Sequence, residues 1–568
     1  MIEIIVFLIL NFFLFIPRYF LNKETSTFFP TGELLVKKKI RPSALLARFN
    51  DDVFRVNLEY TLLVFSFLLF KSYIPITFTK ILFSIFYFFT LTIFYYHYTI
   101  YSIYKTYPAI SIDIKMIQQG IKIGYSGFKG LFILGVILFV CFLASLYFLN
   151  NYLVTLIYEY QSVELLICCI IIIIATVFFA FIKKINPFRF KKEFDFHYLL
   201  YFSVQMTTFV INSNRFFNKK AKEDIDSIPK IIENSILKIP KNITLKHKPN
   251  IYFIAVESYG AIVYENEVYQ EKYKLLTQQI TKNVLQENWK VATTLSKSTV
   301  TAGKSWVAYS SFLKGVDIKS DSIYRHLIAN QKKYQIQSVF EILEKIGYTN
   351  YLVSGLGGFE NYKIEWESIL QFLGTKNVIK YKDLEYKGVT FNFGPSAPDQ
   401  YLLNKSMQLM KEKNKENPFS FFVETINSHY KFDSPTKIFK NWEDCNSSVL
   451  EDFKPIKNLS SNQIENYFLA IEYQLKTIEN LILNENSDAV FVIFGDHQPP
   501  ILTNQNNSYK TPIHIISRNQ SFINDWISKG FSDSMFINDL KLTTEINHYD
   551  FKKQFVEIVT AAFMENKL

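Results

Sequence analysis

At 568 residues the chain is longer than one hydrophobic core supports, so two or more domains are expected. The net charge of +11 lies in residues 1–249, where 28 Lys and Arg against 15 Asp and Glu give +13, whereas the remaining 34 against 36 give −2. Because these basic residues flank apolar segments and build no separate basic stripe, they indicate contact with anionic lipid headgroups and argue against nucleic-acid binding.

Five apolar stretches in the N-terminal third approach or exceed the length of a membrane span. A helix needs about 20 apolar residues to cross the hydrocarbon core of a bilayer. The first stretch contains Glu3, has no basic residues before it and is followed by no small-residue cleavage site, which argues against a signal peptide. The sequence therefore predicts a multispan helical membrane domain of about five helices over residues 1–184. The stretches are 1–17, 58–76, 79–98, 130–150 and 164–182.

The charges of the loops bear on the orientation of these spans. The basic loops 18–57 and 99–129 are expected in the cytoplasm by the positive-inside rule, and five spans then leave the C-terminal half inside the cell. An additional crossing by 195–212 would reverse this, but that stretch is too polar for a good span and fits an interfacial amphipathic helix better. Residues 185–249 are predicted to form this helix and a linker.

From residue 250 onward, strand-like apolar runs alternate with longer helical patterns such as 334–346 and 464–483. This alternation is typical of an α/β domain, so residues 250–568 are predicted to fold around a central, mostly parallel sheet. Cys445 is the only cysteine in this half, which excludes a disulfide framework or a cysteine-based zinc site there.

Two of these runs end in metal-ligand residue types. The run 251–256 leads into Glu257, and the run 490–495 leads into Asp496 and His497. In open α/β sheets, ligands bind just beyond the carboxyl ends of the strands. Two carboxylates and an imidazole delivered to that edge predict a divalent-metal site. The alternative is two ordinary core strands with capping acids.

Between these runs the chain reads Gly303-Lys304-Ser305, followed by a helix-compatible segment, 306–313. A P-loop is excluded, because Walker A requires a glycine at the position that Ser298 occupies. A hydroxyl at the start of a helix lies in the positive field of the backbone N–H groups, which favours an anionic phosphoryl group. The alternative is that Ser305 only caps the helix.

Taken together, Glu257, the Gly-Lys-Ser segment and the Asp496-His497 pair resemble the alkaline phosphatase/sulfatase superfamily. The resemblance is to its membrane-anchored branch of lipoteichoic acid synthases and related phosphoglycerol transferases. It covers the architecture of the whole chain, with residue-level matches only within 250–515. It implies a sulfatase-like catalytic domain in which Glu257, Asp496 and His497 bind Mn²⁺ or Zn²⁺.

The resemblance assigns roles to Ser305 and His429, and the residue types assign roles to Lys304, Thr299 and Thr301. Ser305 occupies the position of the nucleophile, where the synthases usually have Thr, and is expected to bind the metal as well. Lys304 would offset charge on the phosphoryl oxygens. His429, in Asn-Ser-His-Tyr after the predicted strand 419–423, matches a histidine that binds the substrate or leaving group. Thr299 and Thr301 are alternative nucleophiles.

The chain departs from the family in two segments. Where the synthases carry a histidine after the second helix, residues 354–358 read Ser-Gly-Leu-Gly-Gly, so a glycerophosphate contact is missing or replaced. The Cys/Ser-x-Pro-x-Arg signature of formylglycine sulfatases is absent, because Ser305 is followed by Trp-Val-Ala-Tyr. Hydrolysis of sulfate esters is therefore not expected.

Two other residues have a functional and a structural interpretation. Trp366, in an aromatic stretch, is a candidate for the lining of a glycan or headgroup pocket, although packing is the default in a chain with 17% aromatic residues. His514 lies inside the apolar run 512–516, where a buried histidine is the alternative to a substrate or second-metal role.

Together with these residues, the resemblance implies a metal-dependent membrane phosphotransferase that moves a phosphoglycerol- or phosphoethanolamine-like group from a lipid to a cell-surface glycan or lipid-linked acceptor, through a phospho-serine intermediate. The expected location is the cell membrane with the catalytic domain outside the cytoplasm, despite the loop charges. The alternatives are a phosphodiesterase or sulfatase-like hydrolase of the same fold, and an inactive sulfatase-like binding module.

Overall fold

The computed structural model divides the chain into two compact units, Met1–Lys220 and Ala221–Leu568. The predicted interfacial helix at 195–212 and most of the predicted linker lie outside the described residues. The structure describes residues 1–21, 35–36, 39–40, 56–104, 110, 113–114, 121, 125, 129–160, 162–182, 220–233, 235 and 245–563, apart from 358–362, 392–395, 416, 431, 448–461, 501, 503–508 and 541–542.

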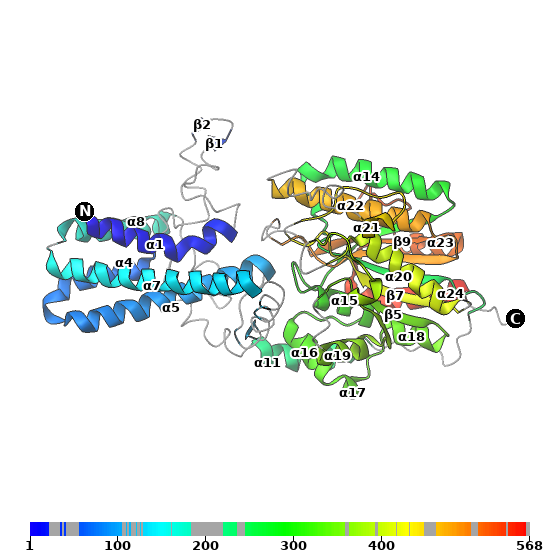
Figure 1. Ribbon diagram of the computed structural model, residues 1–568, viewed down its shortest axis with the longest axis horizontal. Coiled ribbons are helices and arrows are strands. Elements are labelled where there is room, and N and C mark those ends of the chain that lie inside the picture. The colour runs from blue at the N-terminus through cyan, green and yellow to red at the C-terminus, as the bar shows by residue number, and fades with distance from the viewer. Residues whose placement is uncertain are drawn as a thin grey trace. The chain divides into compact units, whose positions relative to one another are not determined.

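In the N-terminal unit, each predicted apolar stretch is helical over most of its length, and the stretch 58–76 is interrupted at residues 74–75 (Figure 1). Its helices pack around a cluster rich in aromatic and branched aliphatic side chains. A short antiparallel ladder, β1 with β2, is the sheet element among the described residues of this unit. The elements are α1 (Ile2–Leu21), β1 (Leu35–Val36), β2 (Lys39–Ile40), α4 (Leu58–Phe70), η1 (Lys71–Tyr73), α5 (Ile76–Tyr104), α7 (Lys129–Glu159) and α8 (Val163–Ile182).

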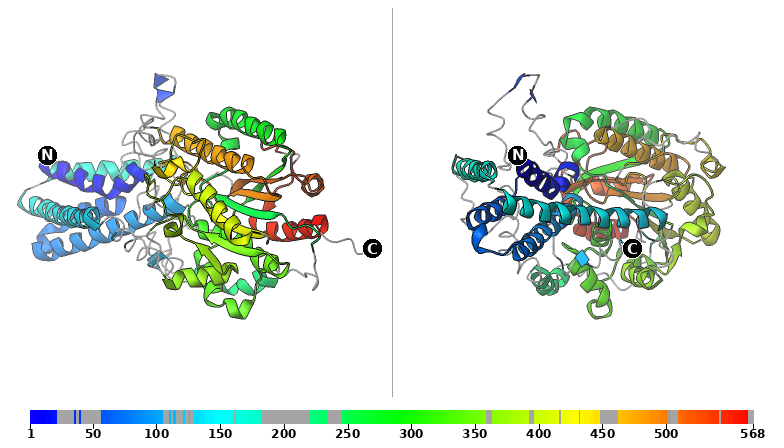
Figure 2. Two further views of the ribbon diagram at one scale, coloured as in Figure 1. Left: turned by 45° about the vertical axis from the view of Figure 1, so that its right-hand side comes forward. Right: turned by 60° about the vertical axis from the view of Figure 1, so that its left-hand side comes forward.

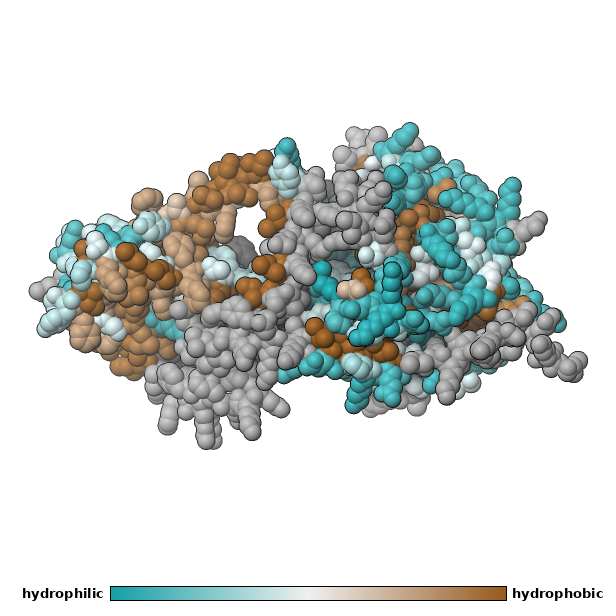
Figure 3. Space-filling view, turned by 90° about the horizontal axis from the view of Figure 1, so that it is seen from below, coloured by the Kyte–Doolittle hydropathy of each residue, from teal (hydrophilic) through white to brown (hydrophobic). Residues whose placement is uncertain are grey.

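Two stretches in the described part of the chain, Ile76–Tyr96 and Lys129–Glu159, are long and apolar enough to cross a membrane. Shorter apolar stretches occupy Ile2–Ile16 and Val163–Ala175. The helix α7 exposes many large hydrophobic side chains between Leu131 and Val140, and Figure 3 shows hydrophobic residues over much of the visible surface of the N-terminal helices. Such a surface is unusual in water and fits contact with lipid. Five crossings remain a prediction.

The C-terminal unit contains an eight-stranded sheet in the order β10-β4-β9-β8-β3-β7-β5-β6. All neighbouring pairs are parallel except those of β9, which runs antiparallel to β4 and β8. The expected α/β architecture with a mostly parallel sheet is therefore present. The strands are β3 (Asn250–Val256), β4 (Lys290–Lys297), β5 (Thr349–Val353), β6 (Asn377–Ile379), β7 (Phe419–Glu424), β8 (Ala489–Gly495), β9 (Lys510–Ser517) and β10 (Ile546–Asn547).

Both faces of this sheet are covered by helices (Figures 1 and 2). Alternate residues of β3 belong to two different hydrophobic clusters, with Tyr252 and Ile254 on one side and Ile251 and Phe253 on the other. Burial on both faces explains why the strands read as continuous apolar runs rather than as alternating patterns. The first cluster includes residues of α14 (Glu267–Gln286), α20 (Asp399–Asn414) and α22 (Gln463–Leu483), and the second includes residues of α15 (Ser305–Lys314), α18 (Val339–Lys345), α23 (Gln520–Ser528) and α24 (His548–Phe563).

One predicted helix is broken. The segment 334–346 is not continuous, because α17 ends at Tyr334 and the next residue, Gln335, has a left-handed φ of 47°. A new helix then begins at Val339, where Ser338 and Glu341 form a capping box. The remaining short helices are α11 (Lys220–Asp226), α12 (Ile228–Glu233), α13 (Ile262–Glu265), α16 (Asp321–Ala329), α17 (Gln331–Tyr334), α19 (Lys363–Leu373), η4 (Tyr381–Leu384) and α21 (Asp444–Ser447).

A buried lysine on α24 makes the stability of this unit pH-dependent. Lys552 is 3% exposed and donates to the carbonyl of Gln337 at 2.9 Å. Burial, and then the nearby charge of Lys314, lower the pKa of Lys552 to about 7. Between that value and its ordinary pKa of 10.5, the folded state binds fewer protons than the unfolded state. The free energy of unfolding therefore rises with pH across this window. The stability gained in this way is lost as the pH falls back through about 7.

We expect Lys552→Met to flatten this pH dependence, by up to about 1.4 kcal/mol per pH unit between pH 7 and 10. Denaturant unfolding of the full chain at several pH values measures the slope. Lys553→Met is the matched control, because the neighbouring Lys553 is exposed and should leave the slope unchanged. An unaltered slope in Lys552→Met would contradict the assignment.

Candidate active site

The sheet register brings three strand ends to one edge of the C-terminal unit. Val256 of β3 pairs with Gly495 of β8, and Ala255 pairs with Glu424 of β7. The residues that follow, Glu257 and Asp496, therefore emerge side by side at the carboxyl end of the sheet. This is the edge at which open α/β sheets bind ligands.

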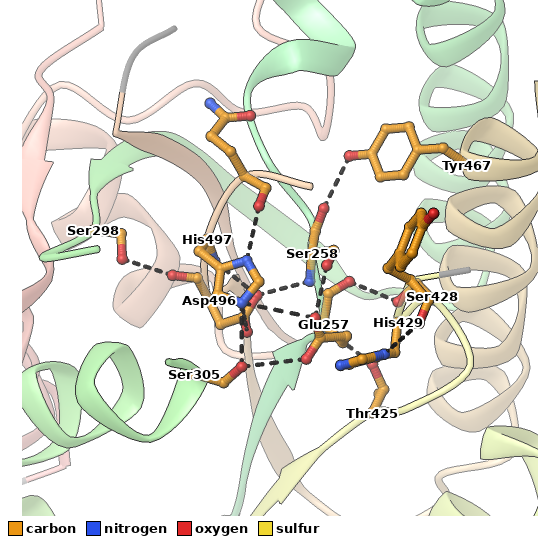
Figure 4. A network of polar contacts seen from close by, with 12 residues as sticks. Glu257, Ser258, Ser298, Ser305, Thr425, Ser428, His429, Tyr467, Asp496 and His497 are labelled. Atoms are coloured by element: carbon orange, nitrogen blue, oxygen red, sulfur yellow. Dashed lines mark hydrogen bonds and ion pairs between the residues drawn. The ribbon is translucent and has the colours of Figure 1, made fainter. Parts of the chain in front are cut away.

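Three of the residues predicted to bind metal lie together at this edge. Glu257, Asp496 and His497 are buried, and one ligand atom from each lies within 4.8 Å of the others. The Nε2 atom of His497 is 3.2 Å from Asp496 Oδ2 and 3.7 Å from Glu257 Oε1. This spacing lets one divalent cation contact all three side chains, since such ligands bind at about 2.0–2.2 Å. Figure 4 shows the three groups facing one another.

The hydrogen bonds of Asp496 leave one carboxylate oxygen for a cation. Its Oδ1 accepts from the backbone N–H of Ser258 at 2.8 Å and of His497 at 2.7 Å. Its Oδ2 is buried and, among the described residues, has no hydrogen-bond partner. Burial, and then the charge of Glu257, raise the pKa of Asp496 to about 7. An oxygen that is neither solvated nor hydrogen-bonded is costly, so the residues present fit a bound divalent cation.

His497 is oriented for the same purpose. Its Nδ1 lies 2.8 Å from the carbonyl oxygen of Gln498, which is the partner of a protonated Nδ1. The Nε2 lone pair is then directed at the carboxylates, as in metal-binding histidines whose second nitrogen donates to a carbonyl. The tautomer therefore follows from the backbone next to the residue.

Ser305 reaches this group from the first turn of α15. Its hydroxyl donates to Glu257 Oε2 at 3.3 Å and lies 3.2 Å from His497 Nε2. The helix is not capped by Ser305, because the capping position is Lys304, which makes no side-chain capping bond. Gly303 and Lys304 both have left-handed φ angles, 61° and 60°, and this tight turn presents Ser305 to Glu257 and His497.

A carboxylate that sequence reasoning missed, Glu424, ends β7 beside Ser305. Phe422 packs against Tyr309 of α15, with ring centroids 5.0 Å apart. Glu424 is two residues further along the same face of β7, and Ser305 is one helical turn earlier on α15, so the two side chains meet. Burial, followed by the charges of Glu257 and Asp496, raises the pKa of Glu424, whereas a hydrogen bond with Ser305 opposes the rise.

His429 lies in the loop that follows β7. The neighbouring Ser428 donates to the backbone carbonyl of Glu257 at 2.6 Å, which ties this loop to the end of β3. His429 Nδ1 is 2.6 Å from the carbonyl oxygen of Tyr430, and Figure 4 shows the imidazole on the side of Glu257. The loop is further fixed by Asp399, whose buried carboxylate accepts the backbone N–H groups of Ile426 and Asn427.

The other residues singled out in the sequence lie elsewhere or are only partly described. His514 is fully buried in β9, and its two ring nitrogens contact Thr293 Oγ1 and the Tyr259 hydroxyl, each at 2.9 Å. Burial lowers its pKa to about 3, so this geometry is that of a neutral structural histidine. Trp366 lies in α19, with its side chain outside the described part. The Thr299 hydroxyl is buried without a hydrogen-bond partner among the described residues, and the Thr301 carbonyl accepts the Gln498 N–H at 2.9 Å.

Gly495, the last residue of β8, permits a close approach at this edge. A Cβ atom placed there would lie 1.9 Å from the carbonyl oxygen of Tyr259, which is backbone and cannot move aside. Gly495→Ala should therefore displace Asp496 and His497.

We expect Gly495→Ala to lower the affinity for Mn²⁺ or Zn²⁺ by at least about tenfold and to destabilise the unit by about 1–3 kcal/mol. Titration calorimetry and denaturant unfolding measure the two effects. Gly135→Ala is the control, because a Cβ at Gly135 meets no atom within 4 Å. Unchanged metal affinity in Gly495→Ala would show that the close approach is unimportant for the site.

Comparison with known proteins adds a family match. Residues 249–520 match the family model described as Sulfatase. No match is found among curated proteins. Among solved structures, the chain is similar to the lipoteichoic acid synthase LtaP from Listeria monocytogenes, with 15% identity, a TM-score of 0.37, and coverage of 60% of this chain and 78% of that one.

Two further similar structures come from other bacteria. The soluble domain of lipooligosaccharide phosphoethanolamine transferase A from Neisseria meningitidis is 12% identical, with a TM-score of 0.34, and the match covers 57% of this chain and 94% of that one. The Streptococcus pyogenes phosphoglycerol transferase GacH, in complex with sn-glycerol-1-phosphate, is 14% identical, with a TM-score of 0.34 and coverage of 60% and 81%.

Proposed function

Because residues 249–520 match the Sulfatase family model, we propose that this protein is a metal-dependent membrane phosphotransferase. It moves a phosphoglycerol- or phosphoethanolamine-like group from a lipid donor to a cell-surface glycan or lipid-linked acceptor. The observation that carries the proposal is the position of the Ser305 hydroxyl against Glu257 and His497, within a buried group suited to a divalent cation.

Ser305 is the proposed nucleophile. When bound, Mn²⁺ or Zn²⁺ would lower the pKa of the attacking hydroxyl and offset charge on the phosphoryl oxygens. Glu257, Asp496 and His497 would hold the cation. The Ser305 hydroxyl gives its proton to Glu257, the carboxylate to which it donates, and this proton returns when the serine is restored. The Ser305 oxygen forms a bond to phosphorus while the bond from phosphorus to the diacylglycerol oxygen breaks, which leaves the headgroup phosphate on the serine. Lys304 neutralises part of the charge that develops in this step.

His429 is the proposed proton donor for the leaving diacylglycerol oxygen. Its loop is fastened to β3 by Ser428 and to α20 by Asp399, so the imidazole has a defined position at the strand ends. In the second step, an acceptor hydroxyl attacks the phosphorus, and the bond to Ser305 breaks and restores the free serine. Microscopic reversibility lets His429 receive the acceptor proton.

Water as the acceptor gives the hydrolase alternative, and the site chemistry is the same for both reactions. An inactive binding module is disfavoured, because the two carboxylates, the imidazole and the serine are all present and adjacent. Sulfate-ester hydrolysis is disfavoured by the residues after Ser305, which lack the formylglycine signature.

The proposed location is the cell membrane, with the catalytic unit on its outer side. Two helices that are long and apolar enough to span support membrane anchoring. Anchoring raises the effective concentration of a donor that is itself confined to the bilayer. A protease added to intact cells should digest the C-terminal unit if it lies outside, and digestion only after lysis would overturn this location.

The function is tested with the purified full chain, Mn²⁺ or Zn²⁺, and labelled phosphatidylglycerol or phosphatidylethanolamine. The expected products are diacylglycerol and a protein adduct whose mass identifies the transferred headgroup. Release of free headgroup phosphate in place of a transfer product would favour the hydrolase. Absence of both diacylglycerol and adduct with either lipid would refute the proposal.

A further inference from the structure

A cleft of about 560 Å³ lies apart from the residues assigned above, between α20, α21 and the chain after η4. Its volume is within the range of small-molecule sites, about 300–1,000 Å³. Three aromatic side chains line it, Tyr386, Tyr401 and Trp442. Nothing in the proposed chemistry of Ser305 uses these residues.

The aromatic side chains form a fixed platform. The ring centroids of Tyr386 and Tyr401 are 4.9 Å apart, and those of Tyr401 and Trp442 are 5.4 Å apart. The Tyr386 hydroxyl donates to the Val389 carbonyl at 2.7 Å, and the Tyr401 hydroxyl donates to the Leu384 carbonyl at 2.8 Å. Because both phenols are anchored and both tyrosines are buried, the partly exposed Trp442 offers the accessible aromatic face.

The backbone around the cleft is held in a specific shape. The amide of Asn446 donates to the Glu385 carbonyl at 3.3 Å and accepts from the Lys387 N–H at 2.6 Å. Glu385 has a left-handed φ of 52°, which is unfavourable for a residue other than glycine. Strained residues held by surrounding hydrogen bonds are concentrated at ligand-binding positions.

The charges of the lining indicate the class of ligand. Two lysines, Lys387 and Lys405, and two glutamates, Glu385 and Glu443, give a formal charge of zero. Such a lining favours neither an anionic phosphate nor a cationic amine, but it supplies both donors and acceptors for hydroxyl groups. A pyranose ring has an apolar C–H face for Trp442 and a rim of hydroxyls for these side chains.

The cleft is joined to the same sheet edge as Ser305. Asp399, at the start of the helix that carries Tyr401, donates its N–H to Asn427 Oδ1 at 2.7 Å, two residues before His429. The next residue, Gln400, exchanges hydrogen bonds with the backbone of Phe439 at 2.7 and 3.0 Å, which fixes the segment that carries Trp442. The chain therefore runs from the β7 end, through His429, to the cleft.

We propose that this cleft binds a neutral sugar ring of the acceptor glycan, with Trp442 as the stacking platform. The inference rests on the proposed function only for the identity of the sugar as acceptor, because carbohydrate binding is measurable without transfer. The cleft would hold one ring of the chain while another hydroxyl of the same chain approaches Ser305.

The test measures the binding of neutral oligosaccharides to the full chain in detergent by saturation-transfer NMR. The probes are linear tri- to hexasaccharides of glucose, galactose, rhamnose and N-acetylglucosamine, with choline and glucose 6-phosphate as charged comparators. We expect at least one neutral oligosaccharide to bind. Trp442→Ala should lower the affinity for it at least tenfold, and Trp442→Phe should retain most of the affinity. Tyr334→Ala, a partly exposed aromatic residue on α17, is the control.

Lys405→Ala is a second variant in case Trp442→Ala does not fold. It should also lower the affinity for the same oligosaccharide. The inference is overturned if no neutral oligosaccharide binds at millimolar concentration, if binding is unchanged in both variants, or if only choline or glucose 6-phosphate binds. Ser305→Ala should keep carbohydrate binding while losing transfer. Carbohydrate binding at Trp442 in a chain that forms no lipid adduct would refute the proposed function alone, whereas transfer with no binding at the cleft would refute this inference alone.

Discussion

Ser305→Ala should lower headgroup transfer by at least about 1,000-fold and abolish the covalent phosphoryl adduct. The variant removes the only side-chain oxygen of α15 that contacts Glu257 and His497 among the described residues. The alanine should leave the fold intact, because Ser305 does not cap the helix through its side chain. Diacylglycerol release from labelled lipid and intact-mass analysis measure the two losses.

Two substitutions sharpen this result. Ser310→Ala, on the same helix, removes a buried hydroxyl that has no hydrogen-bond partner within the described residues, so activity should be unchanged. Ser305→Thr keeps the hydroxyl in the residue type that lipoteichoic acid synthases usually have, and should retain adduct formation. Adduct formation that survives in Ser305→Ala would move the nucleophile to another residue, with Thr301 and Thr299 the first to test.

The second large effect is expected from Asp496→Asn. The substitution keeps the shape of the side chain but removes its charge, and an amide is a weak ligand for Mn²⁺ or Zn²⁺ beside a single carboxylate. We expect the metal affinity to fall by at least about 100-fold. In the wild type, metal at 100 times its Kd should stabilise the fold by about 2.7 kcal/mol, and at the same concentration the 100-fold weaker site of the variant should leave about 0.4 kcal/mol or less.

Titration calorimetry and metal-dependent unfolding are the measurements for Asp496→Asn. Asp525→Asn, on α23, removes a carboxylate outside the metal-binding group and should behave as the wild type. Retention of wild-type metal affinity by Asp496→Asn would mean that the buried carboxylates serve folding and do not bind a cation.

The strand ends were the most predictable part of the site. The runs before Glu257 and Asp496 are apolar because both faces of the sheet are covered by helices. An acidic residue directly after such an apolar run is therefore easy to recognise in the sequence. Their convergence depends only on β3 and β8 being parallel neighbours, which the α/β pattern favours. Residue types and a general rule of sheet geometry were therefore sufficient.

Glu424 shows where the same reasoning was not carried through. It follows an apolar run as Glu257 does, so the rule used for β3 and β8 also applies to β7. The antiparallel direction of β9 and the break of the predicted helix at Gln335 are different, because they depend on long-range packing and on one left-handed residue. The sequence around the aromatic cleft also carried no signal, since its lining comes from three separate segments.

The two outermost strands of the large sheet are very short, with three residues in β6 and two in β10. An edge strand has unpaired backbone groups with which a strand of another chain can pair, and a short edge strand offers few of them. The C-terminal unit is thus protected against self-association through the edges of its sheet. Such short edge strands would limit cross-β pairing between copies held in one membrane, the location proposed above.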